Sequence, residues 1–487
     1  MNNKNSGFKQ GLNLFDSSMI VIGSMIGSGI FIVSADIART TGSAGMLLLV
    51  WIITGIVTLI AALSYGELAA LMPEAGGQYV YLNKAYNPLT GFLYGWTFFL
   101  IIQTGTIAAV AVAFAKFTAV LIPWFGENNI LLNIIGLKIS SAQLLAIFSI
   151  SILTFINYKG LREGKIVQDT FTISKTIVII GLIFLAFTIG SNASVIKENF
   201  TDIWNAERLH LLNGKIDWIE HLSGFSLIAA VGVAMVGSLF SSDAWNNITF
   251  TAGEVQNPKR NIPLSLFIGT LTVTIIYLLV NISYLFILPI HGNPDGSTIR
   301  EMGIQFAAND RVGTAAAYSF LGDTSAYIMA ALIMISTFGC NNGLILAGAR
   351  VLYAMSKDNL FFKKAGELNK NAVPGAALIM QAVWASILCL SGTYGQLLDY
   401  VIFAVLLFYA FTIAGIFILR KKMPDAPRPY KAIGYPVVPL LYIVFAITMC
   451  VILLINKPQY TWPGLFIVML GIPVYFVYSR INKKLSK

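Results

Sequence analysis

The chain has 487 residues, of which 56% are hydrophobic and only 11% are charged, and its net charge is +10 with a mean hydropathy of +0.75. A soluble domain is about a quarter charged, so this composition excludes an ordinary water-soluble protein. The bilayer suits such an apolar surface, because one spanning helix takes roughly 20 apolar residues. The sequence therefore predicts an all-α membrane protein.

Apolar runs recur along the chain and predict twelve spanning helices. Their expected ranges are 14–36, 44–72, 88–120, 140–158, 165–190, 222–253, 263–290, 322–356, 372–392, 396–420, 434–456 and 461–480. The longest connections, near 191–221 and 291–322, are expected to be loops that can contain short helices of their own. Residues 1–13 are expected to form a cytoplasmic tail, since nothing there resembles a cleaved signal peptide.

Lysine and arginine are distributed unequally over the two predicted sides. With the N-terminus inside, 22 of them fall on the inner side, 9 fall on the outer side, and Lys175 lies within a span. Basic residues are enriched in cytoplasmic loops of membrane proteins. We therefore expect a multi-pass protein of the plasma membrane with both termini cytoplasmic. The positive charge then faces anionic lipid headgroups rather than nucleic acid.

The first and sixth predicted spans are interrupted by weak helix formers. The first contains Gly27-Ser28-Gly29, and the sixth contains Ser241-Ser242-Asp243. Matching interruptions in two halves of a chain point to a transporter built from inverted repeats. The expected repeats are 14–190 and 222–420, with two additional helices in 434–480.

Several motifs resemble those of one transporter superfamily. Gly27-Ser28-Gly29-Ile30-Phe31 is similar to the first-helix signature of the amino acid–polyamine–organocation superfamily. Further stretches resemble its L-type amino acid transporter branch, in a bacterial form: Gly76-Gly77-Gln78-Tyr79, Val167-Gln168-Asp169, Glu254-Val255-Gln256-Asn257-Pro258 and Phe338-Gly339-Cys340-Asn341. The similarity runs from about Gly11 to Ser479. It implies a leucine-transporter-like fold of five plus five helices with helices 1 and 6 broken.

The interruptions predict where an amino acid would bind. A half-helix that begins after a break offers free N–H groups and a positive dipole end, so Gly27, Ser28 and Gly29 are expected to hold a carboxylate. The alternative is a simple kink or close helix packing. The resemblance implies ammonium acceptors at the carbonyls near Met25, Phe240 and Asp243, with the Phe240 ring as a lid.

The second interruption contributes further candidates. Ser241 belongs to the same unwound segment, and Asn246 is expected to tune the size and polarity of the site. A charge at mid-depth in a membrane is a functional hypothesis by default. Asp243 is therefore a candidate counter-ion for the ammonium. It is equally a candidate cap on the unwound segment, or a partner for a cation elsewhere.

Lys175 lies about ten residues into the fifth span, roughly 15 Å from its inner end and near the middle of the bilayer. Gln168, Thr172 and Lys175 share one helical face. The resemblance implies that Lys175 replaces the sodium ion that ties helix 1 to helix 8 in coupled relatives. Its ammonium would contact carbonyls near Gly27 and polar atoms near Cys340 and Asn341. The alternative is a lysine that lines a water-filled vestibule.

Two further charged residues are expected near an inner gate. Glu67 lies near the inner end of the second span, and Arg350 lies at the end of the eighth. The prediction pairs Glu67 with Arg350 or with Lys84.

The function expected from these features is amino acid transport by alternating access. Sodium-independent exchange of small-to-medium neutral L-amino acids is favoured, with no cofactor, no metal and no enzymatic activity. A polyamine or cationic amino acid antiporter, an ion-coupled symporter, an intramembrane enzyme and a channel are the alternatives. No histidine lies in a predicted span, which disfavours an intramembrane enzyme. The segment 160–166 departs from the phosphate-binding loop pattern, which disfavours a pump driven by ATP.

The sequence also bears on partners. Eukaryotic members of the resembled branch pair with a glycoprotein through a cysteine in the loop between spans 3 and 4. The corresponding loop, about Leu121–Lys138, contains no cysteine. A disulfide-linked heavy chain is therefore not expected, and the oligomeric state stays open.

Overall fold

The computed structural model describes residues 7–134, 137–212, 215–391 and 394–485. Within these ranges, 10 helices are long and apolar enough to cross a membrane. Two shorter apolar helices, α1 (Leu14–Met25) and α16 (Gly375–Ser391), account for the other two predicted spans. The predicted architecture of long apolar helices is confirmed, with two short β-hairpins in the connections as the exception.

The spanning helices follow the predicted order. In the first half they are α3 (Ala44–Leu71), α5 (Pro88–Thr97) continued by α6 (Gln103–Leu121), α7 (Ser141–Lys159) and α8 (Leu161–Leu185). In the second half they are α10 (Gly224–Ser241), α12 (Pro258–Ile287), α15 (Ser325–Lys357), α17 (Tyr394–Lys422), α18 (Val437–Asn456) and α19 (Pro458–Leu485). The division into two inverted repeats stays a prediction.

Local sequence explains where several of these helices begin. The Ser43 side chain accepts a hydrogen bond from the Met46 N–H at the start of α3, and Ser140 with Gln143 forms a capping box at the start of α7. Asn87 caps α5, whose first residue is Pro88. These caps satisfy N–H groups that a helix end leaves without partners, as a membrane interior requires.

Short elements fill the connections. They are α2 (Val33–Thr41), α4 (Gln78–Ala85), α9 (Ala193–Thr201), α11 (Asn247–Phe250), α13 (Ile299–Met302) and α14 (Val312–Leu321), with hairpin strands β1 (Ile130–Ile134), β2 (Leu137–Ser140), β3 (Glu207–Leu212) and β4 (Lys215–His221). Both hairpins are antiparallel, and Glu207 pairs with His221 in the second. The 191–221 connection is thus more ordered than the loop that its composition predicts.

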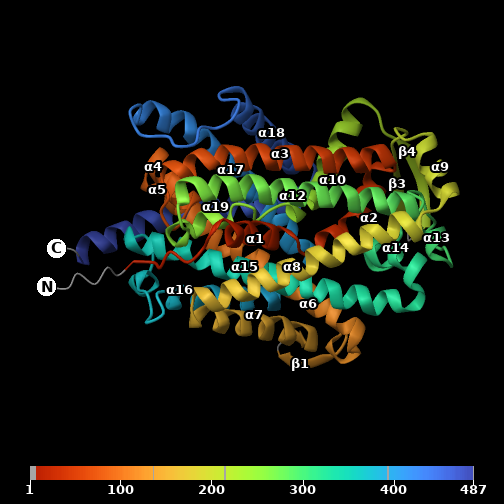
Figure 1. The fold of residues 1–487 in the computed structure, drawn as a ribbon, viewed down its shortest axis with the longest axis horizontal. Helices are drawn as coiled ribbons and strands as arrows, with labels where there is room; N and C mark the ends of the chain where they lie inside the picture. The colour runs from red at the N-terminus through yellow and green to blue at the C-terminus, as the bar shows by residue number, and fades with distance from the viewer. Residues whose placement is uncertain (1–6, 135–136, 213–214, 392–393, 486–487) are drawn as a thin grey trace.

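The elements form one elongated bundle (Figure 1). The described ends of the chain lie at one end of the bundle, and β3, β4 and α9 lie at the opposite end. We call the latter the outer end, following the predicted orientation, which stays a prediction. Helix α1 packs centrally against α8, α12 and α15.

The surface of the bundle is apolar where the helices face outward. Ile177 and Phe184 on α8 are 64% and 65% exposed. Water would solvate such a surface poorly, whereas lipid tails solvate it well. This exposure fits a multi-pass membrane protein.

Candidate functional site

The first helix break lies where the glycines predict it. Helix α1 ends at Met25, Ile26 is extended (φ −76°, ψ 99°), and one 3-10 turn over Gly29–Phe31 precedes α2. Within the described residues, the N–H groups of Gly27, Gly29 and Ile30 donate to no protein acceptor. Ser28 is buried in the same segment. Free donors at the start of a half-helix suit an anion such as a carboxylate.

The carbonyl side of the same break is already bonded by Lys175. Its ammonium nitrogen lies 2.7 Å from the Gly23 oxygen, 2.5 Å from the Ile26 oxygen and 3.3 Å from the Ser336 oxygen on α15. Gln168, Thr172 and Lys175 are all fully buried, which confirms that their shared face of α8 points into the bundle. The ammonium therefore joins α8, the broken first helix and α15.

Two expected contacts of Lys175 differ in the structure. The prediction places its ammonium against polar atoms of Cys340 and Asn341, but its bond to α15 goes to the Ser336 carbonyl, about one helical turn earlier. The Cys340 thiol instead donates to the Ser24 carbonyl at 3.0 Å. Among the described residues the buried Oδ1 of Asn341 has no partner. The predicted contact with carbonyls near Gly27 agrees with the Ile26 contact, whereas the prediction for α15 named the right helix but residues about one turn too late.

Ser336 reinforces this connection. Its hydroxyl lies 3.1 Å from the Ile26 oxygen and 3.0 Å from the Gly27 oxygen. Sequence reasoning missed this residue, because a serine in a spanning helix commonly bonds its own preceding turn. The carbonyls of the break are thus satisfied by protein groups, while several of its N–H groups are not.

The second break separates α10 from α11. Ala244 has a left-handed φ of 65° there, a conformation that costs a non-glycine residue roughly 1–3 kcal/mol. The Tyr409 hydroxyl donates to the Asp243 carboxylate at 2.6 Å. Asn246 donates to Gln78 at 3.1 Å, and Trp245 packs among aromatic rings including Tyr65. The Asp243 carboxylate therefore already has a protein partner, which favours its role in holding the unwound segment.

Tyr277 links the two breaks. Its hydroxyl, on α12, lies 3.0 Å from the Met25 oxygen and 3.0 Å from the Ser241 oxygen. Gly29 also touches the second break, since a Cβ built there would lie 2.0 Å from the Ser241 hydroxyl. The structure thus brings Met25, Gly29 and Ser241 together. Sequence reasoning missed Tyr277, because a tyrosine in an apolar span is typical of core packing.

Phe240 lies at the end of α10, partly buried and directly before Ser241. On its outer side, a cavity of about 550 Å³ is lined in part by Val236 and Gly237, about one turn earlier on α10. Beyond the second break, a small pocket of about 20 Å³ is lined in part by Asp243 and Asn246. The larger cavity also borders Ile32 and Val33, directly after the first break.

The predicted pairing of Glu67 is wrong. Glu67 forms a bidentate pair with Arg420, at 2.9 and 2.7 Å, and accepts the Ala432 N–H at 2.7 Å. Arg350 instead pairs with Glu254, at 3.0 and 2.8 Å. Glu67 and Arg350 therefore belong to two separate ion pairs. Arg420 lies 353 residues from Glu67, and pattern reading cannot supply a pairing at that separation.

Comparison with known proteins agrees with this geometry. The amino acid permease family matches residues 12–477. The large neutral amino acids transporter small subunit 2 of Mus musculus is 28% identical over 476 residues, which cover 96% of this chain and 81% of the relative. The b(0,+)-type amino acid transporter 1 of Homo sapiens is 25% identical over 495 residues, which cover 99% and 92%.

The family match covers nearly the whole chain, including both helix breaks. It accounts for the broken-helix bundle as a leucine-transporter-like fold within the amino acid–polyamine–organocation superfamily. The chain therefore belongs to the amino acid permease family, and it is a membrane transporter of amino acids rather than an enzyme.

Proposed function

We propose that this transporter exchanges small-to-medium neutral L-amino acids across the plasma membrane, independently of sodium, by alternating access. The proposal depends chiefly on Lys175, whose ammonium bonds carbonyls of Gly23, Ile26 and Ser336. The Lys175 ammonium at this junction supplies the charge that a bound sodium ion would otherwise bring. Without a coupling ion, substrate on the far side is what returns the carrier.

The proposed substrate contacts follow from the two breaks. The carboxylate binds the N–H groups of Gly27 and Gly29, in the buried segment that also contains Ser28. The ammonium binds second lone pairs of carbonyls near Met25, Phe240 and Asp243. Phe240 covers the bound substrate, and Asn246 borders the side-chain pocket. Neutral cargo fits, because the Asp243 carboxylate is already bonded to Tyr409.

We further propose that the chain works without a disulfide-linked heavy chain. Cys340, Cys389 and Cys450 are all buried in the bundle, and the loop 121–138 contains no cysteine. Nonreducing electrophoresis of the protein purified from its membrane tests this point. A band that shifts on reduction would contradict it.

The transport proposal is tested by efflux of labelled amino acid from liposomes that contain the purified protein. External alanine, serine or leucine should accelerate efflux strongly, and replacing sodium by choline should leave the rate unchanged. Equal efflux with and without external amino acid would refute exchange. Acceleration by lysine alone would instead support the cationic alternative.

The role of Lys175 is tested by Lys175→Met, which keeps the stem and removes the charge. We expect transport to be abolished, because the variant loses the bonds that join the first break to α15. Lys197→Met, at an exposed position of α9, is the matched control and should transport normally. Normal transport by Lys175→Met at normal expression would count decisively against the assignment.

A further inference from the structure

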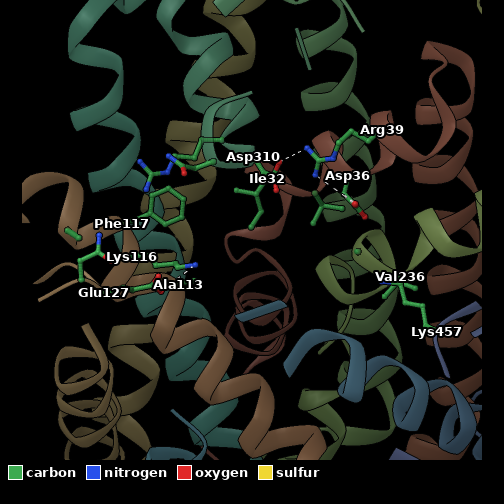
Figure 2. A pocket seen from close by; sticks show the side chains of 16 residues that line it. Ile32, Asp36, Arg39, Ala113, Lys116, Phe117, Glu127, Val236, Asp310 and Lys457 are labelled. Atoms are coloured by element: carbon green, nitrogen blue, oxygen red, sulfur yellow. Dashed lines mark hydrogen bonds and ion pairs between the residues drawn. The ribbon is translucent and has the colours of Figure 1, made fainter. Parts of the chain in front are cut away.

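We call the outer cavity of about 550 Å³ the vestibule, and Figure 2 shows the side chains that line it. Its floor includes Ile32 and Val33, next to the first break, and Gly237, about one turn before Phe240 on α10. A Cβ at Gly237 would lie 2.6 Å from the Val33 side chain, so the two broken helices meet closely at this floor. An amino acid that arrives from the outer end passes through this vestibule.

The acidic groups of the vestibule already have cationic partners. The Asp310 carboxylate lies 2.6 Å from the Arg39 guanidinium, and the Asp36 carboxylate lies 3.8 Å from it. The Glu127 carboxylate lies 3.4 Å from the Lys116 ammonium. Figure 2 shows these pairs in two groups, with Arg39, Asp36 and Asp310 together and Lys116 close to Glu127 and Phe117. Three carboxylates and four cationic side chains, Arg311 and Lys457 among them, line the cavity, so its lining carries one net positive charge.

Arg311 is a further cation in the same cavity. Its guanidinium carbon lies 5.1 Å from the centre of the Phe117 ring. Among the described residues, no carboxylate oxygen lies within ion-pair distance of it, and its guanidinium donates to no protein acceptor. Burial lowers the pKa of Arg311 from its usual value, but a guanidinium keeps its proton in proteins. The vestibule therefore contains a half-buried guanidinium that no carboxylate of the described residues contacts directly.

The position of Arg311 connects it to the transport path. Gly313, two residues later, packs against the first broken helix, since a Cβ there would lie 2.9 Å from the Phe31 ring. The aromatic contact occupies a face of the guanidinium, whereas its N–H groups point outward in the guanidinium plane. Those edge donors match the two oxygens of a carboxylate.

We propose that Arg311 forms an outer recognition site that binds the α-carboxylate of an arriving amino acid before it reaches the helix breaks. This inference rests on the proposed function, because it takes the amino acid to arrive from the outer end. An ammonium gains nothing from Arg311, so the site favours carboxylate-bearing cargo over amines such as polyamines. Because the site is close to water, its attraction for the carboxylate is screened. It therefore speeds the arrival of the substrate more than it slows its release.

The test places a chosen charge at position 311. The three native cysteines are buried, so a single new thiol in Arg311→Cys should be the main target of a membrane-impermeant reagent. One portion of the reconstituted protein is modified with a cationic methanethiosulfonate and another with an anionic one. The rate of leucine exchange is then measured as a function of the external leucine concentration. Wild type and Lys116→Cys receive the same reagents as controls.

We expect Arg311→Cys to raise the external half-saturation concentration roughly threefold or more. The cationic adduct should restore it, and the anionic adduct should raise it further, with little change in the rate at saturating leucine. Lys116→Cys should respond weakly, because Lys116 is paired with Glu127.

Equal effects of the two adducts would overturn the inference, since size and not charge would then matter. Equal responses at positions 116 and 311 would also overturn it, because they would indicate a diffuse field. If wild type exchanges leucine and the two adducts of Arg311→Cys have the same half-saturation concentration, this inference alone is refuted. If wild type does not exchange leucine, the proposed function is refuted.

Discussion

The two ends of the bundle carry ion pairs of different kinds. At the end opposite the hairpins, the side chains of Arg350 and Glu254 are each 1% exposed. At the outer end, those of Lys116 and Glu127 are 43% and 55% exposed. The first pair is out of reach of water, and the second borders an open vestibule. Together with the cavity at the outer end, the difference fits a conformation that is more accessible to water at the outer end than at the other.

Backbone hydrogen bonds also hold the end of the bundle that contains Arg350 and Glu254. The N–H groups of Gly11 and Leu12 donate to the Glu254 carbonyl at 2.9 and 3.0 Å, and the Gln256 N–H donates to the Leu12 carbonyl at 2.8 Å. Asp16 then pairs with Lys165 at 2.9 Å. The segment before α1 is therefore fastened to the segment after α11. Opening this end requires that these contacts separate.

The largest expected effect comes from the buried pair. Glu254→Gln leaves the Arg350 charge without a partner in a dry site, and should lower stability by about 3–5 kcal/mol. Thermal unfolding of the detergent-solubilised protein measures this loss. The double variant Glu254→Leu with Arg350→Met should recover most of it, because no charge then remains to be solvated. A single variant as stable as wild type would contradict the comparison.

A smaller effect is expected at Glu67, whose partners Arg420 and Arg428 are 25% and 9% exposed. Glu67→Gln weakens charged hydrogen bonds while some water can reach Arg420, so a loss of roughly 1.5–3 kcal/mol should follow. The same unfolding experiment reports it. A loss of stability equal to that of Glu254→Gln would show that burial of the partner does not determine how much each ion pair contributes.

The smallest effect is expected in the vestibule. Lys116→Gln breaks an exposed pair, and such pairs contribute about 0–1 kcal/mol. Raising the salt concentration should reduce even this difference, because exposed charges are screened. A change above about 2 kcal/mol would mean that the outer end is closed in solution, and would reverse the comparison.

Much of this architecture could be predicted from the sequence. Hydropathy located all twelve spans, because lipid demands long apolar helices. Glycine and serine located the first break at Gly27, and depth with helical spacing singled out Lys175. These features are local, or they follow from the bilayer.

The features that could not be predicted depend on contacts between distant segments. Tyr277 resembles an ordinary core residue until its hydroxyl is seen between Met25 and Ser241. The choice of Glu254 for Arg350 depends on how α11 approaches α15. The hairpin over Glu207–His221 was missed, because its strands are short and carry several charged residues.

A covalently attached ammonium such as that of Lys175 differs from a dissolved ion in how its site is filled. A dissolved ion occupies its site in proportion to its supply, so dilution empties the site. An ammonium on a covalent stem has an effective concentration fixed by the length of that stem. The junction of the Ile26 and Ser336 carbonyls is therefore filled in every copy of the protein, whatever salt surrounds it. The amino acid sequence at residue 175 therefore sets the occupancy of this site, and the ion concentration of the solution does not.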